Sequence, residues 1–421
     1  MSAAPSRLEQ ARPPVSAAPR QLDRSLLVIA AGVTAAIHVA KLPPALPALQ
    51  ASLGLGLVEA GFLISLVQLA GLALGLAVGL AADSLGLRRT LLGGLVLLSG
   101  VSLGSGFASS VGVLLALRAL EGLGFLLAVM PAPGLIRRLV APERLSVRLG
   151  MWGTYMPVGT ALALLAGPVW IAALGWPAWW WLAGALSAVM ALAVWRVLPA
   201  DPPAAARQGG ARAAGWRARL AGTLRARGPW LVALAFAVYS SQWIAVVGFL
   251  PTIYAQAGLA PATAGIATAI AAGVNMLGNL ASGRLLHGGH RPEQLLQAGF
   301  AAMALGGVLA FAPVWPSVAG LDVAGPYLAV LVFSAVGGLV PGTLFSLAVR
   351  LAPHAGAVST TVGWMQQWSA FGQFAGPPVV AWVASRAGGW AWSWLVTVAC
   401  ACAGLLLARR IGALRRSLVA A

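Results

Sequence analysis

The chain has 421 residues, of which 60% are hydrophobic and 9% charged, and its mean hydropathy is +0.87. A soluble protein of this length could not bury so much apolar surface, so the composition indicates a lipid bilayer as partner. A net charge of +18 is compatible with nucleic-acid binding, but the cations lie at the ends of apolar stretches, so we expect no nucleic-acid partner.

Residues 1–24 are rich in Pro, Ala and Arg and contain no apolar core, so we expect a disordered cytoplasmic tail and not a signal peptide. Twelve apolar stretches follow, each of about 20 residues or more, which is the length of a membrane-spanning helix. They are 25–46, 57–80, 90–108, 111–136, 148–172, 177–198, 230–254, 262–284, 294–313, 325–349, 357–383 and 389–408. The sequence therefore predicts an all-α membrane protein with twelve transmembrane helices.

Small-residue and tryptophan motifs recur at equivalent places in the two halves of the chain. Ala60-Gly61 and Gly79 recur as Ala264-Gly265 and Gly283, Ala166-Gly167-Pro168 as Ala375-Gly376-Pro377, and Gly175-Trp176 as Gly389-Trp390. Chance is the alternative, because these residue types are abundant here. Duplication predicts two parallel six-helix repeats with a site between them: an N-terminal bundle at 25–198, a cytoplasmic linker at 199–228, a C-terminal bundle at 229–410 and a cytoplasmic tail at 411–421.

The basic residues follow the positive-inside rule if the N-terminus is cytoplasmic. All of them except Lys41, Arg118 and Arg386 then fall in inner segments or beside them. We therefore expect a multi-pass protein of the cytoplasmic (inner) membrane, with both termini in the cytoplasm, that acts as a monomer.

Spans three, six and twelve contain no ionisable or amide side chain in their middles, and span nine has glutamines only near its inner start, whereas the other spans do carry polar side chains. Because polar groups are costly in hydrocarbon, this pattern predicts that eight helices surround a wet substrate cavity. The predicted cavity residues are Thr34, His38, Lys41, Gln68, Arg118, Tyr155, Tyr239, Gln242, Asn275, Asn279, Gln366 and Gln373. The alternative is that these groups only bond helices to one another.

Two cations lie within or near the spans and need a partner or an anionic ligand. Glu121 lies three residues after Arg118 on the same helix face and can pair with it. If Lys41 and Arg118 face the cavity, the solute is an anion or has an anionic end, and Glu121 is the leading group for proton coupling. The alternatives are a structural Arg118–Glu121 ion pair and a Lys41 at the outer surface.

The connection between the second and third spans joins two glycines, an acid and basic residues, Gly79, Asp83, Gly86 and Arg88. These residues resemble the loop signature of the major facilitator superfamily, and Arg118-Ala-Leu-Glu121-Gly122 resembles its fourth-helix motif. The resemblance implies alternating access by two rocking bundles. It also implies conformational gating by the four loop residues, with Asp83 meeting the inner start of span eleven near residues 357–359. The second half keeps Gly283-Arg284 but has no acid four residues after the glycine, which puts a matching lock there in doubt.

Two further segments resemble the cyanate- and nitroimidazole-transporter branch of that family, Gly248-Phe-Leu-Pro251-Thr-Ile-Tyr254 and the glutamine-rich run Gln366–Pro378. We expect a secondary active transporter for a small polar solute, an anion being one option, coupled to protons. The alternatives are a multidrug or metabolite efflux antiporter and a non-transporting membrane sensor.

We expect neither an enzyme nor a cofactor, because the nine acids and four histidines are scattered along the chain. His287 and His290 have no acid or Cys nearby, so we expect no metal site.

Overall fold

The computed structural model describes residues 23–54, 57–202, 215–314 and 321–420, and the regular elements within these ranges are all helical. The N-terminal half contains α1 (Arg24–Ala40), η1 (Pro43–Ala45), α2 (Leu46–Leu53), α3 (Leu57–Leu85), α4 (Leu87–Ser105), α5 (Val111–Val129), α6 (Ala132–Leu139), α7 (Pro142–Trp152) and α8 (Tyr155–Val197). The connecting α10 (Trp216–Arg225) is followed by α11 (Arg227–Gln256), α12 (Pro261–Gly273), α13 (Asn275–His287), α14 (Pro292–Phe311), α15 (Leu321–Gly337), α16 (Leu339–Arg350), η2 (Ala355–Ala357), α17 (Val358–Ala387), η3 (Trp390–Trp392) and α18 (Trp394–Ala420).

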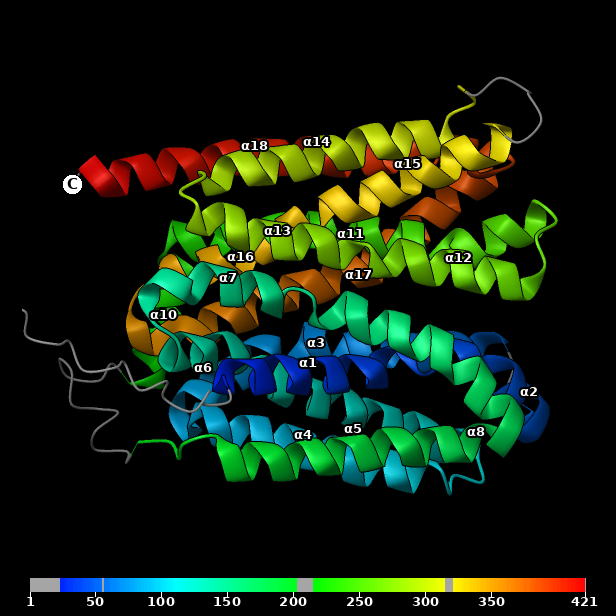
Figure 1. Ribbon diagram of the computed structural model, residues 1–421, viewed down its shortest axis with the longest axis horizontal. Helices are drawn as coiled ribbons and strands as arrows, with labels where there is room; N and C mark the ends of the chain where they lie inside the picture. The colour runs from blue at the N-terminus through cyan, green and yellow to red at the C-terminus, as the bar shows by residue number, and fades with distance from the viewer. Residues whose placement is uncertain (1–22, 55–56, 203–214, 315–320, 421) are drawn as a thin grey trace, which may run out of the picture.

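Ten helical segments among the described residues are long and apolar enough to cross a membrane. One of them, Pro142–Val197, makes two passes, because the chain folds back at Gly175, whose φ of 81° is accessible to glycine without strain (Figure 1). The 30-residue α17 makes a further pass through the centre. The predicted all-α fold of twelve passes in two six-helix halves is thus confirmed.

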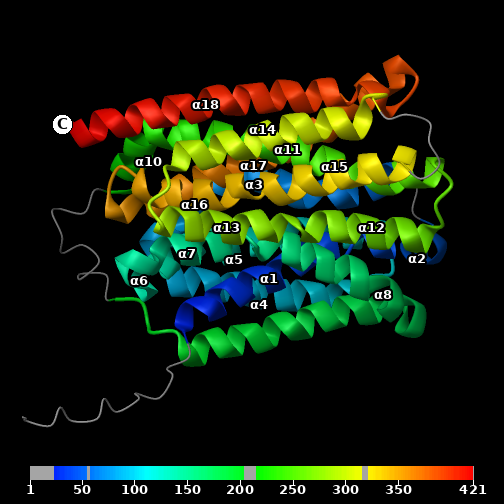
Figure 2. The ribbon, with the colours of Figure 1, turned by 45° about the horizontal axis from the view of Figure 1, so that its top comes forward.

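The helices run side by side along the long axis, with α1–α8 on one side of the molecule and α11–α18 on the other (Figures 1 and 2). The halves meet where α3 packs against α17, and where α7 and α8 pack against α13 and α12. Four passes are interrupted near mid-length, at the α5–α6, α7–α8, α12–α13 and α15–α16 junctions. Discontinuous helices of this kind expose backbone and side chains at the middle of a transporter.

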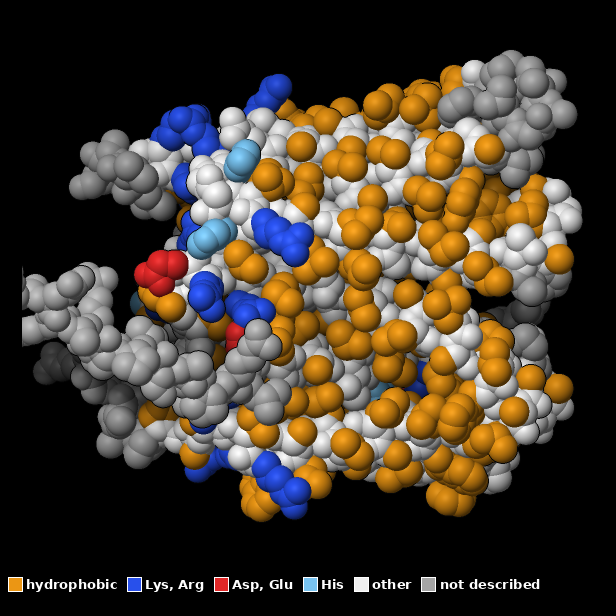
Figure 3. Space-filling view, viewed as in Figure 1, with side chains coloured by type: hydrophobic (Ala, Val, Ile, Leu, Met, Phe, Trp, Pro, Cys, Tyr) orange, Lys and Arg blue, Asp and Glu red, His pale blue; other side chains and the backbone are white. Residues whose placement is uncertain are grey.

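Cationic side chains gather at one end of the molecule, where α1 begins and α18 ends, whereas apolar side chains cover the middle (Figure 3). We call this the basic end and the opposite one the far end. Val169, Trp382 and Leu406 are more than half exposed on the apolar surface, as expected for side chains that face lipid.

The structure describes the predicted linker and terminal tails only in part. Residues 1–22 and 203–214 lie outside the described residues, so the predicted disorder of the tail 1–24 and most of the linker 199–228 are untested. The described part of the linker contains a helix, α10. The predicted tail 411–421 continues α18 without interruption as far as Ala420.

Candidate functional site

A cavity of about 70 Å³ lies between the two halves, near mid-length. The interruptions in the helices help to build it, because Tyr155 begins α8 and Asn275 begins α13. Its polar lining residues are Gln68, Tyr155, Tyr239, Ser240, Trp243, Asn275, Gln366, Ser369 and Gln373. Three phenylalanines, Phe125, Phe236 and Phe345, also line it. No charged side chain is among the described lining residues, so the cavity presents neutral hydrogen-bonding groups and aromatic rings.

Helical periodicity explains how α11 and α17 present their polar groups to the cavity. Positions 236, 239, 240 and 243 of α11 line it, and so do 366, 369, 370 and 373 of α17. Both sets follow the i, i+3, i+4, i+7 spacing of one helix face. Sequence reasoning missed Ser240, Trp243 and Ser369. The same spacing could have found Trp243 from Tyr239, Ser240 from Trp243 and Ser369 from Gln366.

Hydrogen bonds across the cavity join the two halves. Gln68 of α3 bonds to Gln373 of α17 at 2.8 Å, and Gln366 of α17 bonds to the hydroxyl of Tyr155 at 3.2 Å. A ligand with its own donors and acceptors could replace these contacts. They are therefore suited to change when the halves move and the ligand binds or leaves.

A second cavity of about 430 Å³ continues from the first toward the far end. The two share Gln68, Met156, Trp243 and Gln373 in their linings. The larger cavity is lined by residues from the second halves of α1, α11 and α17, helices that all start at the basic end, so it lies in the far half of the molecule. It is mainly apolar, and we call it the vestibule.

Two close helix crossings shut the cavity off from the basic end. A Cβ on Gly79 of α3 would lie 2.5 Å from the carbonyl oxygen of Ser359 in α17. A Cβ on Gly150 of α7 would lie 2.6 Å from the Cα of Gly283 in α13. Glycine at these positions lets the halves approach backbone to backbone. The recurring Gly79 and Gly283 thus mark the two crossings that close this end.

Asp83 lies at the first of these crossings and contacts the start of α17. Its carboxylate accepts backbone N–H groups from Ser359, at 3.2 Å, and Thr360, at 2.8 Å, and also the Thr360 hydroxyl at 2.7 Å. An acid at a helix N-terminus satisfies otherwise free N–H donors and interacts favourably with the helix dipole. The contact that the family resemblance implied near residues 357–359 is present.

The other loop residues hold the turn within the N-terminal half. Gly86 has φ 113°, a conformation that favours glycine, and α4 starts directly after it. The Arg88 guanidinium donates to the carbonyl of Trp195, and its backbone N–H donates to Asp201 at 3.1 Å. These contacts fix the start of α4 against the end of α8.

The second crossing uses a histidine where the first uses an acid. His287 is the fourth residue after Gly283, and its Nδ1 donates to the carbonyl oxygen of Glu143, in the first turn of α7, at 2.5 Å. Arg350, at the end of α16, donates to Ser146 of α7 at 2.6 Å. The C-terminal half is therefore also hydrogen-bonded to the N-terminal half at the basic end. His287 and Arg350 are the donors, and a backbone carbonyl and a hydroxyl of α7 are the acceptors.

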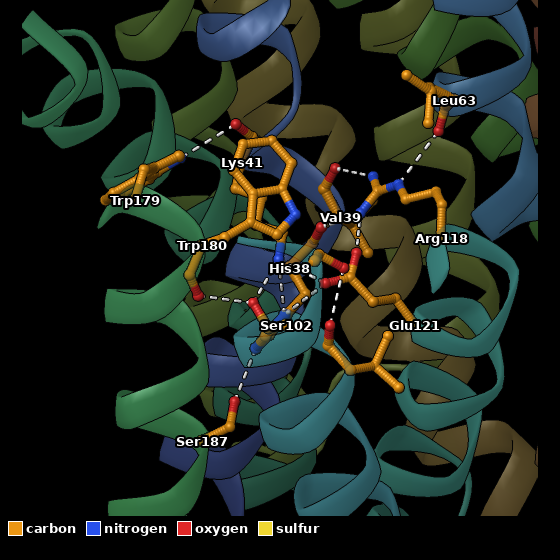
Figure 4. A network of polar contacts seen from close by, with 12 residues as sticks. His38, Val39, Lys41, Leu63, Ser102, Arg118, Glu121, Trp179, Trp180 and Ser187 are labelled. Carbon is orange, nitrogen blue, oxygen red and sulfur yellow. Dashed lines mark hydrogen bonds and ion pairs between the residues drawn. The ribbon is translucent and has the colours of Figure 1, made fainter. Parts of the chain in front are cut away.

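Four ionisable residues of the N-terminal half, His38, Lys41, Arg118 and Glu121, form a buried cluster (Figure 4). Glu121 accepts from Lys41 at 2.5 Å and from Arg118 at 2.8 Å. Lys41 also donates to Ser102 of α4 at 2.7 Å. The guanidinium of Arg118 donates to the backbone carbonyls of His38, Val39 and Leu63. Two cations thus share one carboxylate and several neutral acceptors.

Half of the predicted cavity residues line the central cavity, namely Gln68, Tyr155, Tyr239, Asn275, Gln366 and Gln373. The other six lie elsewhere, and these are Thr34, His38, Lys41, Arg118, Gln242 and Asn279. Thr34 bonds to the carbonyl of Ala30 in its own helix. Gln242 is fully buried, and within the described part of the chain its amide atoms have no hydrogen-bond partner. Asn279 bonds to Asn275 one turn before it.

Two six-helix halves around a central cavity define a membrane transport protein rather than an enzyme. The family model of the Major Facilitator Superfamily matches residues 26–372, so the chain belongs to that superfamily. A stretch of 130 residues is 32% identical to Rv1250, an uncharacterised MFS-type transporter of Mycobacterium tuberculosis; it covers 31% of this chain and 22% of that protein.

Solved structures of the superfamily share the fold. FucP in its outward conformation has a TM-score of 0.73 at 17% identity, over 92% of this chain and 98% of that one. The human organic anion transporter MFSD10 has a TM-score of 0.76 at 18% identity, over 93% and 100%. The proton:xylose symporter XylE has a TM-score of 0.72 at 15% identity, over 92% and 94%. Likenesses at such identities show the fold and leave the substrate open.

Proposed function

We propose that this protein is a secondary active transporter that moves a small polar solute by alternating access. The observation that carries the proposal is the central cavity between the halves, closed at the basic end by two glycine crossings and continuous with the vestibule at the far end. The excess of cations at the basic end supports a cytoplasmic position for that end and for both termini. The conformation described is then open to the outside. We propose the inner membrane as the location and a monomer as the active unit.

The lining favours an uncharged solute with both hydrogen-bonding groups and an apolar face. The expectation of an anion depended on Lys41 and Arg118 facing the cavity, but both are engaged in the buried cluster. The cavity itself offers amides, hydroxyls and aromatic rings, which suit neutral polar ligands. FucP and XylE are described as proton symporters and MFSD10 as an organic anion transporter, so the neighbours differ on this point.

For proton coupling, we propose Glu121 as the carrier, as the sequence suggested. It is a carboxylate buried within the membrane-spanning part of the N-terminal half, and Arg118 connects it to the carbonyl of Val39, a residue of the vestibule wall. Protonation of Glu121 would release Lys41 and Arg118 from their shared partner. Because two buried cations would then lack a counter-charge, protonation would favour separation of α1 from α5, which links the proton to helix movement.

Flux measurements test the transport proposal. Proteoliposomes with an imposed inward proton gradient are expected to accumulate a neutral ligand found in a thermal-shift screen of neutral polar compounds, organic anions and cations. A ligand that binds without any flux would favour the sensor alternative. A hit restricted to charged compounds would contradict the proposed solute.

A second candidate function is the export of an amphiphilic metabolite, which the mainly apolar lining of the vestibule favours. Outward flux of such a compound from proteoliposomes would support this candidate.

Replacing Gln373 with leucine is expected to raise the KM for the solute roughly tenfold, because one hydrogen-bonding group of the cavity is lost. Gln242→Leu is the matched control: it replaces a buried glutamine that does not line the cavity and has no partner in the described residues. We expect its KM to stay within about twofold of the original value. Equal effects of the two substitutions would contradict the assignment of the cavity.

The resemblance to the cyanate- and nitroimidazole-transporter branch stays a prediction. Gln366 and Gln373 of its glutamine-rich run line the central cavity, and Pro377 and Pro378 line the vestibule. These placements support a role for the run in binding. Including small nitrogenous solutes of both kinds in the screen tests the branch directly.

A further inference from the structure

A groove of about 730 Å³ lies at the basic end, outside the transport pathway. It is bounded by the end of α10, the start of α11 and the end of α18 (Figure 2). Its lining residues are Leu224, Arg225, Arg227, Trp230, Leu231, Arg410, Ala413, Leu414 and Ser417. The groove therefore combines three guanidinium groups with a mainly apolar floor.

The three arginines are available to a ligand. Arg225, Arg227 and Arg410 are exposed, and no carboxylate is among the described residues of the lining. None of the three forms an ion pair with another described residue. Three cations that converge without a counter-charge favour an anionic occupant, and guanidinium groups bind phosphate oxygens in a bidentate manner.

The depth of the groove selects the kind of anion. Arg227 begins α11, whose apolar stretch follows at once, and Arg410 comes directly after the apolar part of α18. The arginines thus lie at the level of lipid headgroups, while Leu231 lies one turn deeper along α11. Trp230 is held beside them, because its indole N–H donates to the carbonyl of Leu224 at 2.7 Å. A tryptophan at this level is typical of the membrane interface.

We propose that this groove binds one anionic phospholipid of the leaflet at the basic end. The headgroup phosphate would contact Arg225, Arg227 and Arg410, and an acyl chain would lie against Leu231 and Leu414. A free phosphate could use the cations but not the apolar floor, and it would leave most of the 730 Å³ empty. Basic pockets between transmembrane helices are known binding places for anionic headgroups. The lipid would connect the linker helix α10 to both α11 and α18.

The test compares two triple variants of the full-length protein with equal changes in net charge. Arg225→Gln, Arg227→Gln and Arg410→Gln remove the groove cations. Arg144→Gln, Arg291→Gln and Arg409→Gln remove three other exposed cations of the described surface, none of which lines the groove. Binding of phosphatidylglycerol, phosphatidylcholine and inorganic phosphate to the detergent-solubilised protein is followed by native mass spectrometry and by the shift in Tm.

The original protein and the control variant are expected to bind one phosphatidylglycerol in preference to phosphatidylcholine. The groove variant is expected to lose at least about tenfold in affinity, given the contribution of each cation near an anionic headgroup. A photoreactive phosphatidylglycerol should label the Trp230–Leu231 peptide in the original protein, which tests the site without any substitution. Equal losses in both variants, no preference for phosphatidylglycerol, the same response to inorganic phosphate, or labelling elsewhere would each overturn the proposal.

Discussion

Glu121→Ala is expected to lower the stability of the N-terminal half by about 3–5 kcal/mol, the usual cost of removing one partner from a buried ion pair. Lys41, Arg118 and Glu121 are all at most 2% exposed, and the substitution would leave two cations buried without a carboxylate. The hydrogen bonds of Lys41 to Ser102 and of Arg118 to backbone carbonyls would remain. Neutral acceptors cannot balance two charges in a region of low dielectric constant. Thermal unfolding in detergent should show a Tm far below that of the original protein.

Variants that change the net charge of the Lys41, Arg118 and Glu121 cluster by known amounts serve as controls for this prediction. Lys41→Met leaves a neutral Arg118–Glu121 pair and should cost less stability than any change at Glu121. Glu121→Gln leaves two cations, and adding Lys41→Met to it returns the cluster to the original excess of one cation. The double variant should therefore be more stable than Glu121→Gln alone. If Lys41→Met does not rescue Glu121→Gln, then charge balance is not what holds the cluster together.

The fold could be predicted because it depends on the length of apolar stretches and on motifs that recur in the two halves. Span length follows from the bilayer thickness, and the recurrence of Gly79 as Gly283 marks the same crossing in each half. Asp83 was assigned to the start of α17 from the family resemblance, and the structure has that contact. The spans and the glycine crossings depend on one segment or on a repeated motif, so a single sequence contains them, whereas the Asp83 contact could be expected only from the resemblance to a family.

The buried cluster shows what a single sequence does not contain. Thr34, His38 and Lys41 share one face of α1, but the periodicity of a helix does not say which neighbour that face meets. Lys41 meets Ser102 of α4 and Glu121 of α5, both within its own half, rather than the central cavity. Placing it required knowing that α1 packs against α4 and α5, which are far from it in the chain.

The contact of His287 at the second crossing could likewise not be predicted, because it depends on which helix the side chain meets. The sequence showed that the fourth residue after Gly283 is not an acid, but it did not show that this residue, His287, reaches the first turn of α7. A side chain that donates to a carbonyl replaces one that accepts from N–H groups. The two halves therefore use opposite hydrogen-bond polarity at equivalent positions, which a search for repeated residue types would miss.

Asp83→Asn is expected to shift the protein toward the conformation open at the basic end and to slow transport, while the protein stays folded. Asparagine fills the same space but has no charge and presents one amide nitrogen where an acceptor is needed, so at least one bond from Ser359 or Thr360 is weakened. A charge at a helix N-terminus contributes roughly 0.3–2 kcal/mol. A shift of 1.4 kcal/mol is a tenfold change in the ratio of the two conformations.

Labelling of single cysteines measures this shift, after Cys400 and Cys402 have been replaced by alanine. Ser146→Cys reports on the closed crossing of α7 and α13, where Ser146 is 3% exposed, and Thr160→Cys reports on the vestibule. Because Ser146 also accepts a hydrogen bond from Arg350, each labelling rate is compared with that of the same cysteine variant that retains Asp83. In the Asp83→Asn background, the first cysteine should react faster with a maleimide and the second more slowly. Thr360→Val removes one of the three hydrogen bonds to Asp83 and should give a smaller shift in the same direction. Unchanged rates at both cysteines would show that Asp83 is not part of the lock, because the equilibrium that it is proposed to bias would not have moved.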